Sequence, residues 1–169
     1  MFTRIVFLII LIVFGGCEAR KMPIREVSEI PDQAIEKFTI TETKDGKTHW
    51  VIDSPTAKIY EDQKKALLTA PVIRFFENGK YASTITAEKG SVDMNTYDII
   101  GNGKCTVTTV KGESLETSNL RYLSQAQKIV TDENVILVKK GSIVHGKGME
   151  AAPDLSTITI RNQTTEAVQ

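Results

Sequence analysis

Short runs of β-branched and aromatic residues, separated by turn residues, follow one another from Pro31 almost to the end of the chain. Examples are FTITET, THWVID, PVIRFF, YASTITA, KCTVTTV and NVILVKK, in which apolar and polar positions tend to alternate. Alternation with a period of two is typical of strands that bury one face. No window carries a sustained apolar stripe at helical spacing. The pattern predicts an all-β chain.

Four dipeptides that end in glycine predict where the chain reverses. They are Asp45-Gly46, Asn78-Gly79, Lys111-Gly112 and Lys140-Gly141. Asp-Gly and Asn-Gly are strong short signals for β-hairpins, because both of their residues tolerate positive φ. We therefore expect antiparallel strands joined by tight turns at these points.

A weak internal repeat accompanies the turns. The segment from Thr86 to a turn at Gly112 is matched by the segment from Thr117 to a turn at Gly141, and an earlier copy starts at Ser54. The period is about 30 residues, which two to three strands with their turns would fill. Stacked repeats share a core and leave both ends open. The expected architecture is a rolled β-sandwich of two antiparallel sheets, whose open edges suit pairing with another sheet.

The amino end has a different pattern. An apolar run at positions 5–14 follows Arg4; it is short against the roughly 20 residues of a membrane span and suits a secretory signal. The stretch VFGGC is similar to a bacterial lipobox, with Phe14 in place of the usual Leu, Val or Ile. We expect a signal peptide at 1–16 and a lipidated Cys17 that begins a tether at 17–30. The alternative is an uncleaved anchor with an incidental cysteine.

Composition limits the remaining possibilities. Residues 31–161 are enough for one domain with its own core, and the polar residues 162–169 read as a disordered tail. The chain has 21 basic and 21 acidic residues, so no basic field attracts nucleic acid. With Cys17 lipidated, Cys105 has no partner for an internal disulfide, and its β-forming neighbours predict a buried thiol.

Enzymatic chemistry finds no support in the motifs. His49 and His145 are the only histidines, and neither has the spacing of a metal site. The chain lacks the G-x-S-x-G elbow of serine hydrolases, and the GKG around Lys147 lacks the spacing of a phosphate loop. We expect a protein that is not an enzyme and that uses no metal or other cofactor.

The segments ITAEKGSVD, GNGKCTVTTVKGESLETSNLRY and NVILVKKGSIVHGKGMEAAPDLSTITI resemble the LptC family. Its members are periplasmic, membrane-tethered components of the lipopolysaccharide-export machine. The similarity covers residues 33–161 and rests on the order and spacing of several short motifs. Many members carry a full membrane helix at the front, where this chain carries a lipobox.

The resemblance implies a β-jellyroll that holds lipid acyl chains between its sheets, at the periplasmic face of the inner membrane. Such a protein accepts lipopolysaccharide from an inner-membrane ABC transporter and passes it to an LptA-like bridge. The implied partner edges are 39–43, toward the transporter, and 141–151, toward the bridge. The residues expected at these edges are Thr39, Thr41, Gly141, Gly146, Gly148 and Met149.

An acyl chain needs an apolar lining, which contributes about 0.8 kcal/mol per buried CH₂. Alternation places one apolar set on a common side, and this set is either a lipid-binding lining or the core of a closed sandwich. Only the family resemblance favours the lining. Its expected members are Ile52, Ile59, Leu68, Val72, Ile85, Val92, Cys105, Val107, Leu120, Val135 and Leu137.

Two other functions stay open. A free bridge of the LptA type would have an amino end released from the membrane. A surface lipoprotein for adhesion or sugar binding would display aromatic residues on its loops, whereas Trp50 and most Phe and Tyr residues lie in strand-like runs.

Overall fold

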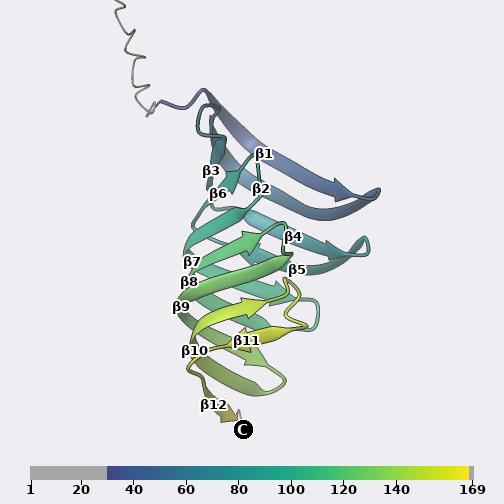
Figure 1. Ribbon diagram of the computed structural model, residues 1–169, viewed down its shortest axis with the longest axis vertical. Helices are drawn as coiled ribbons and strands as arrows, with labels where there is room; N and C mark the ends of the chain where they lie inside the picture. Colours follow the sequence, from purple (N-terminus) through teal and green to yellow (C-terminus); the bar gives the residue numbers. More distant parts are fainter. Residues whose placement is uncertain (1–29, 168–169) are drawn as a thin grey trace, which may run out of the picture.

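The structure is a computed structural model that describes residues 30–167, and every regular element in that part of the chain is a β-strand (Figure 1). The strands are β1 (Gln33–Lys44), β2 (Lys47–Tyr60), β3 (Lys65–Thr69), β4 (Val72–Glu77), β5 (Lys80–Thr86), β6 (Lys89–Asp93), β7 (Ile99–Thr109), β8 (Ser114–Leu123), β9 (Lys128–Lys139), β10 (Ser142–Ala151), β11 (Ile158–Ile160) and β12 (Thr164–Ala167). All pairings are antiparallel. The predicted all-β fold is confirmed.

The strands form one continuous sheet in the order β11-β10-β9-β8-β7-β5-β4-β2-β3-β6, with β1 beside β2 and β12 beside β10. The sheet rolls because its long strands bend. Register breaks lie between Asn102 and Cys105, between Thr117 and Arg121, and at Gly148 between Lys147 and Met149. Such irregularities bend a strand and increase its twist.

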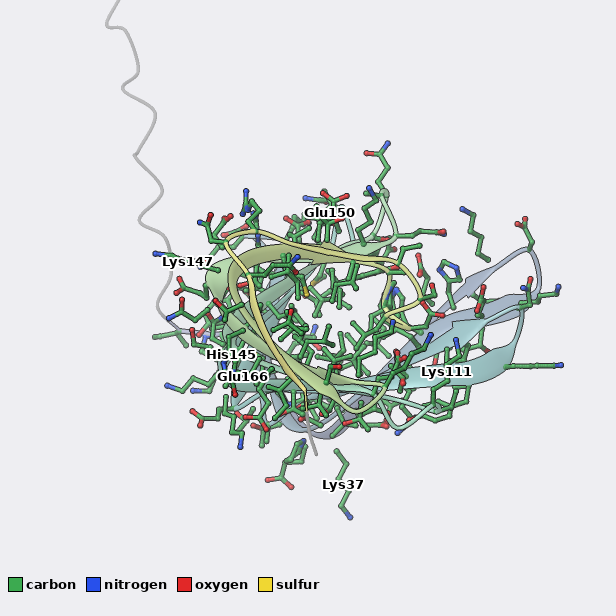
Figure 2. The ribbon with its side chains drawn as sticks, turned by 90° about the horizontal axis from the view of Figure 1, so that it is seen from below. Lys37, Lys111, His145, Lys147, Glu150 and Glu166 are labelled. Carbon is green, nitrogen blue, oxygen red and sulfur yellow. The ribbon has the colours of Figure 1, made fainter. Side chains whose placement is uncertain are left out.

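The bends divide the roll into two facing sheets. The first sheet contains β4, β5, β12 and the halves of β7–β10 nearest the 110–113 and 140–141 turns. The second sheet contains β3, β6, β11 and the other halves of the long strands. Figure 2 views the roll along its length, with Lys147 at the bend and Lys111 at the opposite side, here called the mouth.

Hairpin turns occur at the predicted dipeptides. At 45–46, 78–79 and 140–141 both turn residues have positive φ, and Gly112 supplies a positive φ in the fourth turn. Glycine has no Cβ and adopts positive φ at little cost, which explains why it follows Asp, Asn or Lys in these turns. The hairpin prediction is confirmed at all four places.

The core fills the space between the two sheets. Trp50, Leu115 and Ile129 are completely buried. Phe75 of β4 and Tyr122 of β8 meet across the interior with ring centroids 4.8 Å apart and an interplanar angle of 64°. An edge-on aromatic pair of this kind adds to the stabilisation from burial alone.

Three expectations concern the ends of the chain. The signal peptide, Cys17 and tether residues 17–29 lie outside the described residues. Residues 30–167 include no helix that could cross a membrane. Part of the expected disordered tail, Thr164–Ala167, instead forms β12 and pairs with Ser142–His145 of β10.

Candidate functional site

The interior between the sheets is lined by the apolar set that alternation selects. Apart from Ile59 and Val72, every predicted lining residue is at most 3% exposed. Ile59 is partly buried and packs against the core. The buried members are Ile52, Leu68, Ile85, Val92, Cys105, Val107, Leu120, Val135 and Leu137.

Val72 points the other way. In β4 the buried side chains are Ile73 and Phe75, so Val72 occupies the opposite phase of the strand. The sequence reasoning extended the alternation from Leu68 to Val72 through a turn in which Ala70 has φ of 45°. A residue in the left-handed region changes the direction of the chain, so alternation does not continue across it.

Several interior residues escaped the sequence reasoning. Trp50, Leu115 and Ile129 follow strand alternation and could have been found from it. Leu155 is 0% exposed but lies outside any strand, in APDLS, so no alternation marks it. Met149, expected at a partner edge, is 3% exposed and belongs to the core.

The two titratable groups of the interior lining, Cys105 and Tyr122, are neutral. Burial raises the pKa of the Cys105 thiol to about 11, and the charge of Glu88 adds to the shift. Burial likewise raises the pKa of the Tyr122 phenol to about 12. Neither group ionises near neutral pH, because desolvation disfavours the charged form. The lining therefore offers apolar contact and no reactive thiolate.

The interior is also packed shut. Between Ile73, Phe75 and Ile99 the remaining cavity is ≈ 10 Å³, about the space of one water molecule. An acyl chain could enter this interior only if the sheets separated or if a side chain moved out. A larger hollow lies outside the core, at the mouth.

A hollow of ≈ 370 Å³ lies at the mouth. Phe75 and Tyr122 contribute its apolar part, while His49, Glu77 and Asp154 contribute polar groups. At one end of the hollow Gln127 Nε2 lies 3.3 Å from His49 Nε2, which joins the turn after β8 to β2. Apolar and polar groups thus meet where the interior opens to solvent.

The two edges of the roll differ. β1 pairs with β2 alone among the described strands, and Thr39 and Thr41 are exposed on it. Thr39 Oγ1 donates a hydrogen bond of 2.7 Å to Asp53 Oδ1 of β2. β1 therefore presents a free sheet edge among the described strands, in the region 39–43 where the family resemblance implies a partner surface.

The far edge of β10 is covered by the chain itself. β12 pairs with Ser142–His145, and β11 pairs with Met149–Ala151. The glycines of β10 fit this arrangement, since a Cβ on Gly146 would lie 2.2 Å from Ile160 Cγ2 and 2.9 Å from the Arg161 carbonyl oxygen. Gly148 has φ of 80° at the bend, and Gly141 lies in the turn. The outermost strands at this end are β11 and β12.

The described residues contain no group of three or more His, Cys, Asp or Glu side chains that could hold a metal ion. They present instead a neutral apolar interior, a mouth of mixed character and two sheet edges at opposite ends (Figure 1). This arrangement can join other sheets at its edges, and it could hold an apolar chain only if the closed interior opened.

Comparisons with known proteins agree with this geometry. The model of a family described as "LptC: Lipopolysaccharide-assembly, LptC-related" matches residues 4–168. The chain is similar in structure to LptH of Pseudomonas aeruginosa, the LptA homologous periplasmic component of the conserved lipopolysaccharide transport device. The TM-score is 0.53 at 10% identity, over 67% of this chain and 82% of that one, which shows a shared fold. No curated protein matches the chain.

Proposed function

Because the chain belongs to the LptC-related family of lipopolysaccharide-assembly proteins, we propose that it is a membrane-tethered, periplasmic component of lipopolysaccharide transport. The family consists of transport proteins rather than enzymes. In this proposal the protein holds the acyl chains of lipopolysaccharide between its two sheets and passes the molecule from an inner-membrane ABC transporter to an LptA-like bridge. It makes and breaks no covalent bond.

The apolar lining carries this proposal. Its buried side chains come from both sheets and from strands along the whole roll, from Ile52 of β2 to Leu137 of β9. Each CH₂ group of an acyl chain transferred to such a lining gains about 0.8 kcal/mol. The neutral state of Cys105 and Tyr122 keeps these two lining positions free of charge.

The two ends of the roll supply the partner surfaces in the proposal. The free edge of β1, with Thr39 and Thr41, faces the transporter, and the end formed by residues 141–151 faces the bridge. A partner strand adds to an exposed sheet edge through main-chain hydrogen bonds. Since β12 covers Ser142–His145, the bridge pairs with β12 or takes its place.

The tether belongs to the same proposal. Cys17 carries the lipid anchor and holds the domain at the periplasmic face of the inner membrane; the alternative is an uncleaved amino-terminal anchor. Metabolic labelling with a fatty acid, compared between the natural chain and Cys17→Ser, separates these two. Membrane fractionation then separates either from a free LptA-like bridge, which would be recovered in the soluble periplasm.

The function is tested by photocrosslinking in cells from a probe at Val107, with Thr106 as the matched control. Val107 is 0% exposed on the interior, and Thr106 is its neighbour of opposite phase on the same strand. We expect lipopolysaccharide adducts at Val107 and none at Thr106. If folded, tethered proteins gave adducts at neither position, the interior would be a closed core. The chain would then be a scaffold or a binding lipoprotein.

A further inference from the structure

Residues 152–157 connect β10 to β11 and cross the mouth of the roll; we call them the strap. The strap leaves the second sheet at Ala151 and returns to it at Ile158. Between these points it reaches the first sheet. The Pro153 carbonyl accepts a 2.7 Å hydrogen bond from Ser83 Oγ of β5, and the Leu155 carbonyl accepts a 2.6 Å bond from Lys139 Nζ of β9.

The strap inserts one apolar side chain into the interior. Leu155 is 0% exposed and belongs to the same core cluster as the lining residues Val107 and Leu137. Its φ is 56°, a conformation that costs a non-glycine residue free energy and persists only where surrounding contacts hold it. Leu155 thus fills interior space from outside the sheet.

The attachments of the strap are of a kind that can be released. Among the described residues, the backbone hydrogen bonds of the strap are internal, from Ala152 N to Thr157 O and from Leu155 N to Ala152 O, each 2.9 Å long. Its links to the first sheet come from side chains. The strap can therefore lift without breaking any rung of the β-ladder.

An ion pair with a buried carboxylate fixes one of those links. Glu113 is 6% exposed, and its Oε2 lies 3.3 Å from Lys139 Nζ. Glu113 lies in the turn between β7 and β8. The ion pair therefore holds Lys139 between that turn and the strap. The carboxylate is shielded from solvent, whereas the Lys139 side chain is 22% exposed. Removal of Lys139 alone would leave a buried charge without its partner.

Two hollows border the strap. A hollow of ≈ 370 Å³ is lined by Phe75 and Tyr122 together with strap residues, and a second of ≈ 340 Å³ is lined by Val110 and Lys111. Asp154 lines both. Burial would raise the pKa of Asp154, but hydrogen bonds from Ser156 and the charge of Lys111 outweigh burial and lower it.

We propose that the strap is a gate over the lipid-binding interior: it lifts so that an acyl chain can enter at the mouth and occupy the place of Leu155. This inference rests on the proposed function, because it assigns the entrance of the same interior. Figure 2 shows the side on which it acts, where Lys111 marks the mouth.

A cross-link across the mouth tests the gate. Lys111→Cys and Asp154→Cys place two thiols beside one hollow, and a short bismaleimide joins them. Cys105 does not react with the maleimide near neutral pH, because its thiol is buried and its pKa is raised. The full chain keeps Cys17, whose lipidation in the proposed function blocks its thiol, and carries a photocrosslinking residue at Val107. The control is the same protein capped with N-ethylmaleimide, which modifies both thiols without joining them.

The outcomes separate the gate from the function. We expect lipopolysaccharide adducts in the capped protein and at least a tenfold loss in the cross-linked protein. Equal adducts in both would overturn the gate and leave the proposed function standing. Adducts in neither, nor in the chain with natural Lys111 and Asp154, would overturn both.

A second variant opens the gate instead of locking it. Lys139→Met with Glu113→Gln removes the clamp on the strap, which is the Lys139 hydrogen bond to the Leu155 carbonyl together with the Glu113 ion pair. The double substitution leaves no unpaired buried charge. The matched control is Lys104→Met with Glu116→Gln, which removes an exposed pair 3.6 Å apart. We expect the first variant to form adducts at Val107 several-fold faster than the control. Equal rates in two folded proteins would contradict the gate, and a clamp variant that fails to fold leaves the cross-link to decide.

Discussion

At the scale of single residues, Gly146 shows how a missing side chain makes room for the end of the chain. A Cβ there would collide with Ile160 Cγ2 and with the backbone oxygen of Arg161. We expect Gly146→Ala to lower the free energy of unfolding by about 1–3 kcal/mol, as overpacking commonly does. Denaturant titration measures the change.

The cause is checked by a double-mutant cycle with Ile160→Ala, which removes the nearer of the two atoms. The two substitutions should couple, with the alanine at position 146 costing less in the Ile160→Ala background. Strict additivity would show that the collision with Ile160 is not the source of the loss.

Asp53 predicts a dependence of stability on pH. Its hydrogen bond from Thr39, then the nearby Arg74 guanidinium, hold the pKa of the carboxyl below its usual value. Because the folded pKa is depressed, the stabilisation is present above the unfolded pKa of about 3.9 and is lost as pH falls through the folded pKa.

Asp53→Asn should therefore lower the free energy of unfolding at pH 7 by up to about 1 kcal/mol, since the Arg74 and Asp53 side chains are each 38% exposed. The difference between the two proteins should shrink toward zero in acid. Urea titrations of both proteins at pH 7 and in acid measure the difference in free energy of unfolding. A difference that stayed constant between the two conditions would rule out the Asp53 carboxylate as its cause.

Residue placement was predictable wherever a strand ran without interruption. Val107 and Leu137 could be assigned to the interior because strict alternation leaves a single choice of face. Val72 was assigned wrongly because a residue of positive φ precedes its strand. The burial of Leu155 could not be predicted from sequence. It depends on a loop that folds back between the sheets, and the local pattern of apolar and polar residues does not indicate such a loop.

At the scale of elements, β12 is the strand whose loss should matter least for stability. Thr164, Thr165 and Glu166 are exposed, and within residues 30–167 β12 pairs only with β10. We expect truncation after Gln163 to change the free energy of unfolding by less than about 1 kcal/mol, because little apolar surface is uncovered. Thermal or denaturant unfolding measures this.

The same truncation exposes the backbone of Ser142–His145, and open edges of this kind recruit partner strands. With a photocrosslinking residue at His145, we expect the truncated chain to give more adducts with the LptA-like bridge than the full chain. A probe at Glu116, on a strand inside the sheet, serves as the control. Unchanged adduct yield at His145 would show that β12 does not compete with the bridge.

Element boundaries were predictable where turn chemistry marked them. Asp45-Gly46 and Asn78-Gly79 locate two hairpins because their backbone conformation demands such residues. β12 was missed for the opposite reason. A strand exposed on both faces has no apolar alternation, so its sequence resembles a disordered tail, and only the neighbouring β10 makes it a strand.

At the scale of the whole molecule, the repeat predicted a rolled sandwich with open ends, and the roll is present. Its mouth was not predictable, because it depends on where the long strands bend. Those bends lie at register breaks such as Asn102 to Cys105 and Lys147 to Met149. One extra residue shifts the pairing there. In β8 the buried phase changes from Leu115 to Leu120, and in β10 the inward phase changes from Val144 to Met149.

In the proposed function, the packed interior makes lipid binding compete with the closure of the roll. A protein whose binding-competent state is a minor population binds with its intrinsic affinity reduced by that population. Weakening the closed state should thus tighten binding, provided that the change does not damage the lining. Leu155 of the strap and Leu115 of β8 are both 0% exposed. Substituting each in turn compares a loosened strap with a loosened sheet.

Leu155→Ala and Leu115→Ala should each lower the free energy of unfolding, the latter by about 2–5 kcal/mol, because a buried leucine is deleted from a packed strand. Their effects on lipid should diverge. Leu155→Ala removes the side chain that occupies the acyl position and should increase adduct formation at Val107. Leu115→Ala leaves the strap closed and should not. If both variants captured lipopolysaccharide equally fast, looseness of the whole core, rather than the strap, would control access to the interior.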